Sequence, residues 1–185
     1  MLSKKEFSLL CLSAALIGAG IAAIALLYKK NTPVLPVLQH PEATLRRVAA
    51  PVVHIDNSLV SLGDALVATL RYRALVDFFT RREMPRGLAA PQVGISKRLI
   101  ACGLRGTIHV MINPVILERK GTYLDRDDCL SVENEGETVI SRSAYVRVRY
   151  TTLENRKKIL VARNDDAALI EHEIDHLNGV LNIDH

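Results

Sequence analysis

The most strongly apolar part of the chain is its N-terminal segment. No charged residue occurs from Phe7 to Tyr28, and a pair of lysines flanks this run on each side. As a helix, this run of about 22 residues would rise about 33 Å, enough to cross the hydrocarbon core of a bilayer. The pattern predicts a single membrane-spanning helix, whose orientation the balanced lysines leave undetermined. A cleaved signal peptide is the alternative, because Ala23-Ile24-Ala25 resembles a signal-peptidase site.

Prolines separate this apolar segment from the rest of the chain. Pro33 and Pro36 are typical of a linker. We therefore expect three parts: an anchor or signal segment over residues 1–30, a linker over 31–36, and one globular domain over 37–185. The last part is close to the commonest size of a single domain.

Two segments of the expected domain have the apolar spacing of a helix. Between Leu59 and about Arg82, large apolar residues recur four or five positions apart, at Leu62, Leu66, Leu70, Leu75 and Phe79. A second helix is expected to begin near Asp165 or Asp166, which are good N-caps, and to stop before Gly179.

Short strand-like runs lie between these two helices. They are Arg98–Cys102, Ile108–Ile112, Val115–Leu117, Tyr145–Tyr150 and Lys158–Ala162. The run from Tyr145 alternates apolar and basic residues, and Glu154-Asn155-Arg156 reads as a turn into the last strand. A helix, several antiparallel strands and a final helix form an α+β pattern.

Composition and charge exclude some classes of function. The net charge is +4, but Lys and Arg are spread along the chain, so direct nucleic-acid binding is not favoured. The absence of Trp weighs against a site that stacks bases or sugars. Three cysteines cannot form a disulfide framework. Cys11 and Cys102 have apolar neighbours, whereas Cys129 lies in a polar stretch and needs another explanation.

The final helix contains the sequence His172-Glu173-Ile174-Asp175-His176. Residues four apart lie on one face of a helix, so both imidazoles can reach one metal ion. Glu173 follows the first histidine and could take a proton from a water that the metal activates. The simpler alternative is a helix that has two surface histidines at this spacing by chance. The position of the motif on a well-capped amphipathic helix favours the metal site.

A catalytic metal site usually has three protein ligands, so a third is needed. One alternative lies downstream, but Asn182 occupies the place where a metzincin protease has its histidine. Asp184 and His185 come too late for that register. The other alternative is Cys129, whose thiolate would suit zinc or ferrous iron. Cys129 is the preferred third ligand.

Three segments in this order resemble the motifs of the peptide deformylases. The segment Gly87–Gly94 resembles the glycine-rich first motif, and Cys129–Val132 resembles the second. The segment His172–Gly179 resembles the third. Gln39-His40-Pro41 and Leu45–Ala49 are also similar to the N-terminal region of the family, so the resemblance covers nearly everything from about Val37.

The resemblance implies a fold, a reaction and a set of roles. The fold would be α+β, with antiparallel sheets around a central C-terminal helix. Cys129, His172 and His176 would hold one divalent metal ion, for which Fe²⁺ is the family expectation and Zn²⁺, Ni²⁺ or Co²⁺ are alternatives. Glu173 would be the general base in removing the formyl group from N-formylmethionyl peptides.

Three further roles follow from the same resemblance. The Gln92 amide and the Leu130 backbone N–H would stabilise the developing oxyanion, and Gly87 would let the substrate backbone approach closely. The resemblance implies nascent N-formylmethionyl chains as partners of this protein, with the ribosome as a further candidate. Nascent chains are cytosolic in bacteria. We therefore expect a single-pass protein of the bacterial inner membrane whose catalytic domain is cytosolic.

The sequence departs from the family pattern near the expected site, at Pro85, Arg86, Asp127, Asp128 and Glu171. The three acidic residues would make the surroundings of the metal more negative, which could reduce activity or change the preferred substrate. Asp128 replaces a glycine, and a positive φ there would strain an aspartate. Two alternatives therefore stay open: a deformylase-like protein that only binds, and a metalloprotease or amidase that uses the same helix.

Overall fold

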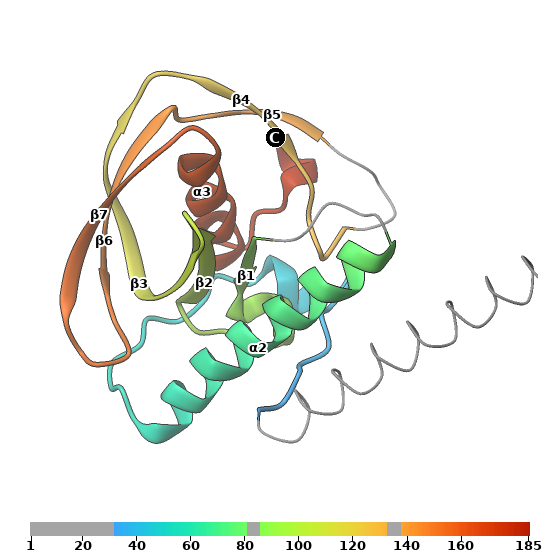
Figure 1. Cartoon of the computed structure of the whole chain (residues 1–185), viewed down its shortest axis with the longest axis vertical. Coiled ribbons are helices and arrows are strands. Elements are labelled where there is room, and N and C mark those ends of the chain that lie inside the picture. The colour runs from blue at the N-terminus through green and yellow to red at the C-terminus, as the bar shows by residue number, and fades with distance from the viewer. Residues whose placement is uncertain (1–31, 81–85, 133–137) are drawn as a thin grey trace, which may run out of the picture.

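The computed structural model describes residues 32–80, 86–132 and 138–185 (Figure 1). Its helical elements are η1 (Ala43–Arg46), α2 (Asn57–Thr80), η2 (Ala90–Val93), α3 (Asp165–Leu177) and η3 (Asn182–Asp184). Its strands are β1 (Gly87–Ala89), β2 (Leu99–Leu104), β3 (Thr107–Lys120), β4 (Tyr123–Asp127), β5 (Thr138–Arg142), β6 (Tyr145–Thr151) and β7 (Lys157–Arg163). The expected α+β class is therefore confirmed.

Two antiparallel sheets make up the strand layer. The larger has the order β1-β2-β3-β6-β7, and the smaller pairs β4 with β5. The pattern predicted two strands where the structure has the single strand β3. Irregularities in its pairing with β6, between Ile112 and Val115 and between Ile116 and Glu118, interrupt the apolar alternation of β3. Bulges of this kind bend a strand, which explains why one element was read as two.

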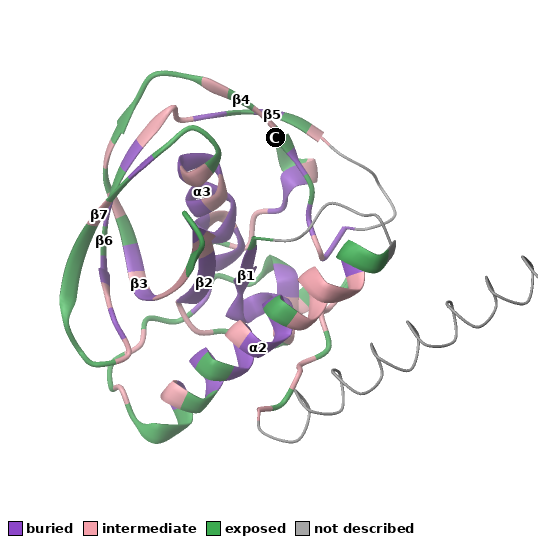
Figure 2. Ribbon diagram, viewed as in Figure 1, coloured by how far each residue is buried: buried purple, intermediate pink, exposed green. Residues whose placement is uncertain are grey.

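The two long helices pack on different faces of the larger sheet. On β2, Ile100 and Cys102 join the core around α3, whereas Leu99 and Ala101 join the core around α2. Figure 1 shows α3 enclosed by the curved sheets and α2 running along the outside. The buried residues of Figure 2 concentrate on α3, β1 and β2. The expected helix surrounded by antiparallel sheets is therefore present.

The structure corrects several details of the sequence analysis. Helix α3 is capped by Asn164, which has φ of 48°, so Asp165 and Asp166 are its first residues and not its caps. The apolar stripe of α2 fails in its second half, because Leu75 is half-buried and Phe79 is exposed. The strands β1, β4 and β5 were not predicted from the apolar pattern.

The N-terminal anchor and the linker boundary were predictions about residues that lie mostly outside the described part of the chain. Among residues 32–80, 86–132 and 138–185, the structure contains no helix of the length and apolarity that a membrane span requires. The run from Phe7 to Tyr28 precedes these residues, so its role stays a prediction.

Candidate metal centre

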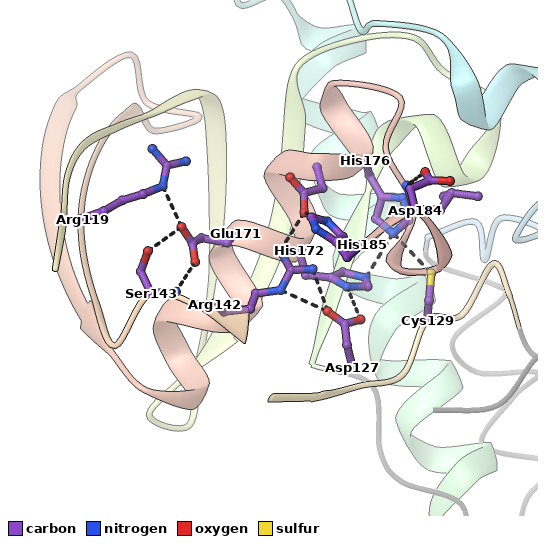
Figure 3. A network of polar contacts seen from close by, with 12 residues as sticks. Arg119, Asp127, Cys129, Arg142, Ser143, Glu171, His172, His176, Asp184 and His185 are labelled. Atoms are coloured by element: carbon purple, nitrogen blue, oxygen red, sulfur yellow. Dashed lines mark hydrogen bonds and ion pairs between the residues drawn. The ribbon is translucent and has the colours of Figure 1, made fainter. Parts of the chain in front are cut away.

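Cys129, His172 and His176 come together at the buried side of α3. One potential ligand atom from each lies within 4.8 Å of the others, and all three residues are buried. The Nε2 atoms of the two histidines are 3.1 Å apart, and Cys129 Sγ is 3.4 Å from His176 Nε2 (Figure 3). A thiolate and two imidazoles that face one point are a common donor set for zinc or ferrous iron. The residues present therefore fit a metal ion.

Local structure explains why these three side chains meet. His172 and His176 are one turn apart on α3, and so project from the same face. Cys129 begins a tight turn after β4, in which Val132 N–H donates to Cys129 O at 3.0 Å. Cys129 and Val132 pack in an apolar cluster with Leu45 and Leu181, which seats the turn beside the helix.

Asp127 orients the first histidine. Its Oδ1 lies 2.6 Å from His172 Nδ1, which leaves His172 Nε2 to face the cluster. Burial raises the pKa of Asp127, but hydrogen bonds and charges from His172 and Arg142 outweigh it and hold the pKa below its usual value. Burial lowers the pKa of His172, but hydrogen bonds to Asp127 and Cys129, with the charges of Glu173 and Cys129, together outweigh it and hold that pKa well above its usual value. Metal binding at His172 Nε2 must therefore compete with a proton.

Arg142 ties Asp127 to the same helix. Its Nε and Nη2 donate to Asp127 Oδ2 at 3.1 and 2.7 Å, and its Nη1 donates to Asp175 Oδ2 at 2.6 Å. The guanidinium is almost completely buried, so both carboxylates compensate its charge. Asp175 Oδ2 also lies 3.0 Å from His185 Nε2. Within residues 32–80, 86–132 and 138–185, Nδ1 of the second histidine has no hydrogen-bond partner, and burial lowers the pKa of His176 well below its usual value.

Glu173 is buried beside the three candidate ligands. Burial raises the pKa of its carboxyl group to about 7, and its Oε2 has no hydrogen-bond partner among the described residues. Gly87 leaves the space that Glu173 occupies: a Cβ at this position would overlap the Glu173 carboxylate and lie 2.8 Å from Leu169 Cδ1. The glycine is therefore needed at least to accommodate Glu173. A carboxyl group with this pKa can exchange a proton near neutral pH.

The first two motifs meet at Gln92. Its Oε1 accepts from Ala89 N at 2.7 Å, and its Nε2 lies 3.2 Å from Ser131 Oγ and 4.0 Å from Cys129 Sγ. The amide nitrogen is thus directed toward the cysteine turn. Leu130, the other predicted oxyanion donor, lies in that turn.

An N-terminal segment holds these two loops together. Leu38 N donates to Gln92 O at 2.7 Å, and His40 N donates to Ser131 O at 2.8 Å. Between them, Gln39 Nε2 donates to Leu130 O at 2.7 Å. Three successive residues therefore connect the loop of the first motif to that of the second.

Comparison with known proteins identifies the family. The model of a family described as polypeptide deformylase matches residues 34–185. The chain belongs to this family. A peptide deformylase from Nitrosococcus oceani is 34% identical over 155 residues, which cover 82% of this chain and 86% of the relative. Members are metal-dependent enzymes, which agrees with the presence of a possible Cys/His/His metal site.

Solved structures of deformylases also resemble this chain. One from Synechococcus elongatus, in complex with actinonin, has a TM-score of 0.73 and 33% identity, covering 83% of this chain and 79% of that one. A class I type b enzyme from Acinetobacter baumannii, bound to Met-Ala-Ser, has a TM-score of 0.70 and 34% identity, covering 82% and 97%. The deformylase fold therefore extends over the described domain.

The positions that depart from the deformylase pattern are mostly compensated. Asp128 is exposed and does not have a positive φ, so the expected backbone strain is absent. Asp127 and Glu171 are paired with Arg142 and Arg119, respectively. Each of these two carboxylates therefore has a cationic partner that compensates part of its charge, and a more negative environment around the centre stays a prediction.

Two other departures, Pro85 and Arg86, lie at the beginning of the first motif. Arg86 forms an ion pair with Asp166 at the start of α3, and its Nε and Nη2 each donate to Gly103 O at 3.4 Å. Arg86 therefore ties the start of β1 to the helix that carries the histidines. Pro85 lies outside the described residues.

Three residues near the candidate metal centre have roles that sequence reasoning missed or left open. Asn182, at the metzincin position, is buried and donates from Nδ2 to Asp127 O at 3.2 Å, away from the ligand cluster. Arg142 and Ser143 were missed because Arg142 ends, and Ser143 follows, a strand that the pattern did not reveal. An isolated arginine in a short polar segment gives no signal of burial before the β4–β5 pairing is known.

Proposed function

We propose that this chain is a peptide deformylase that removes the N-formyl group from N-formylmethionyl peptides of nascent proteins. The observation that carries the proposal is the buried set Cys129, His172 and His176, beside a carboxyl group whose pKa is about 7. Membership of the deformylase family supports the same reaction. The three side chains would hold one divalent ion, with Fe²⁺ proposed first and Zn²⁺, Ni²⁺ or Co²⁺ as alternatives.

The bound ion would supply Lewis-acid activation of water and of the formyl oxygen. Glu173 would take the proton of the attacking water, because a carboxyl group with a pKa near 7 is partly ionised at neutral pH. As the C–N bond breaks, Glu173 would return that proton to the departing amine. The products are formate and a peptide with a free N-terminus.

The developing oxyanion would be stabilised by two donors on opposite loops. Gln92 directs its Nε2 toward the cysteine turn, and the Leu130 N–H belongs to that turn. Preorganised donors of this kind commonly contribute about 3–4 kcal/mol each to transition-state stabilisation. Glu173 fills the space beside Gly87, and β1 is an edge strand of the larger sheet, so we propose that the substrate backbone passes along that edge.

The proposed substrate follows from a solved relative. The Acinetobacter baumannii enzyme binds Met-Ala-Ser, which is what remains when the formyl group is removed from formyl-Met-Ala-Ser. We propose the same peptide as a substrate here. The uncharged run from Phe7 to Tyr28 supports an anchored, single-pass protein. We propose that its catalytic domain is cytosolic because nascent chains are made in the cytosol, while the flanking lysines favour neither orientation.

The test is release of formate from formyl-Met-Ala-Ser by the full chain, purified in detergent and loaded in turn with Fe²⁺, Ni²⁺ and Zn²⁺. We expect turnover with a metal content of one ion per chain. Cys129→Ala should lose both the metal and the turnover. Cys102→Ala is the matched control, because Cys102 is buried in the core around α3 and is absent from the ligand cluster. Metal stoichiometry unchanged by Cys129→Ala would refute the proposed site.

A further inference from the structure

Glu171 is a buried carboxylate that directly precedes the candidate ligand His172. It is 8% exposed and receives three hydrogen bonds. Oε1 accepts from Arg119 Nε at 2.7 Å and from Ser143 Oγ at 2.9 Å, while Oε2 accepts from the Ser143 backbone N at 2.7 Å. Both oxygens are thus used, and the partners come from β3 and from the turn after β5. The family resemblance leads one to expect a glutamine at this position.

These contacts continue through the protein to the metal centre. Ser143 directly follows Arg142, so fixing the Ser143 backbone also fixes the base of the Arg142 side chain. Arg142 holds Asp127 with two hydrogen bonds, and Asp127 Oδ1 lies 2.6 Å from His172 Nδ1. Figure 3 shows the complete path, which leaves α3 at Glu171 and returns to it at His172.

The donors around Glu171 require an acceptor on both branches of the side chain. Arg119 Nε and the Ser143 backbone N can only donate, and they face different oxygens of Glu171. A glutamine would have to present its own N–H₂ group to one of these two donors. The interaction is therefore specific for a carboxylate, and a side chain of the same size does not replace it.

We propose that Glu171 is a positioning residue for His172, acting through Ser143, Arg142 and Asp127. By holding the turn after β5 against α3, Glu171 sets the place of Arg142 and hence the Asp127 carboxylate that orients the imidazole. The inference rests on the metal centre of the proposed function. It goes further in assigning a role to a residue whose side chain hydrogen-bonds to Arg119 and Ser143 and not to a candidate ligand.

The experiment measures Co²⁺ binding by the full chain in detergent, for the wild type and for Glu171→Gln. Affinity is obtained by competition with a chelator, and the ligand geometry from the visible absorption bands of Co²⁺. Removing a direct partner of a ligating histidine weakens metal binding by about 10- to 100-fold. Because Glu171 acts through Asp127, we expect a loss of roughly tenfold, at the low end of that range, together with shifted absorption bands.

Two further variants separate positioning from general stability. Arg119→Gln removes one donor from a side chain that is more than half exposed, so the protein should fold and show a smaller shift of the same kind. Glu118→Gln is the control, because the ion pairs of this neighbouring carboxylate within the described part of the chain are with the surface residues Lys120 and Arg147. It should leave affinity and spectrum unchanged. Thermal unfolding of each metal-free variant is measured alongside.

The outcomes are distinct. If Glu171→Gln keeps the wild-type spectrum and binds Co²⁺ within twofold, the proposal is overturned, and a lower unfolding temperature alone would then mean that Glu171 serves only the fold. If Glu171→Gln does not fold, the spectrum and Co²⁺ affinity of Arg119→Gln are compared with those of the wild type instead, and unchanged values overturn the proposal. If the wild type itself fails to bind one Co²⁺, the metal centre of the proposed function is wrong, and this inference falls with it.

Discussion

The two long helices bury different kinds of side chain. Helix α2 packs on the sheet through leucines, at Leu59, Leu62, Leu66 and Leu70. Helix α3 is half as long, yet it buries ionisable side chains, at Glu171, His172, Glu173 and His176. Both helices face the interior of the same domain. The difference therefore lies in what each contributes to folding and to chemistry.

Burying a leucine stabilises the fold, whereas burying an ionisable group costs free energy unless partners compensate it. Within α3, Glu171 has such partners, while Glu173 keeps an oxygen with no partner among the described residues. Functional sites commonly carry such locally unfavourable arrangements. Substitutions in α3 should therefore change activity more than stability, and substitutions in α2 should do the reverse.

The largest expected effect is on turnover, in Glu173→Gln. Loss of a general acid–base group typically slows catalysis by about 10²- to 10⁴-fold, so formate release should fall in this range. The metal content should stay at one ion per chain, and the free energy of unfolding should not decrease. Glu154→Gln, on the exposed β6–β7 turn, is the control. Loss of the metal in Glu173→Gln would instead make Glu173 a ligand.

The opposite result is expected for Leu66→Ala in α2. Leu66 is completely buried, and truncation of such a side chain costs about 2–5 kcal/mol of unfolding free energy. Well below the unfolding temperature, kcat and metal affinity should stay at the wild-type values. Denaturant unfolding and formate release, measured on the same sample, test this. A fall in kcat without a fall in stability would contradict the division between the helices.

A smaller effect should appear in the pH dependence of the metal-free protein. The pKa of Glu173 is raised from 4.5 to about 7, so the folded state binds this proton more tightly than the unfolded state. Its contribution is fully present below pH 4.5 and is lost as pH rises through 7. At 1.36 kcal/mol per pKa unit, the loss is about 3 kcal/mol.

Comparing unfolding of the wild type and Glu173→Gln in chelator, from pH 4 to pH 8, isolates this contribution. The stability advantage of the glutamine variant should grow with pH over that interval. A constant difference between the two proteins would show that the carboxyl group is not desolvated.

The smallest effect is expected outside both helices, for Gln39→Ala. Its side chain donates one hydrogen bond to Leu130 O and is exposed, so its loss should cost about 1 kcal/mol. Because Leu130 lies in the cysteine turn, KM or kcat should change less than tenfold while metal affinity is retained. A loss of metal in this variant would show that the turn depends on this one bond.

Local patterns in the sequence predicted the parts of the centre that depend on local geometry. His172 and His176 are one helical turn apart, so their spacing alone places both imidazoles on one face. The prediction of Cys129 as the third ligand could not rest on spacing. It rested on the polar sequence around Cys129 and on the resemblance to the deformylase motifs. The structure brings it to the histidines through a turn after β4 that no periodicity revealed.

The supporting residues could not be predicted in the same way. Arg142 and Asp127 are 15 residues apart in the chain, at the end of β5 and the end of β4, and the pairing of these strands leaves no local pattern. The fold shows the same limit. Bulges interrupt the alternation of β3, and the leucine spacing of α2 continues to Leu75 after the burial of that face has ended.

The contacts of residues 38–40 also set how far the protein can be shortened. These residues join the loops of Gln92 and Leu130 by three hydrogen bonds, two of them between backbone groups. A version that starts at Thr32 would keep all three, whereas one that starts at Pro41 would lose them and leave the two loops without this connection. Residues far from the centre in sequence thus mark the shortest chain in which the oxyanion donors stay side by side.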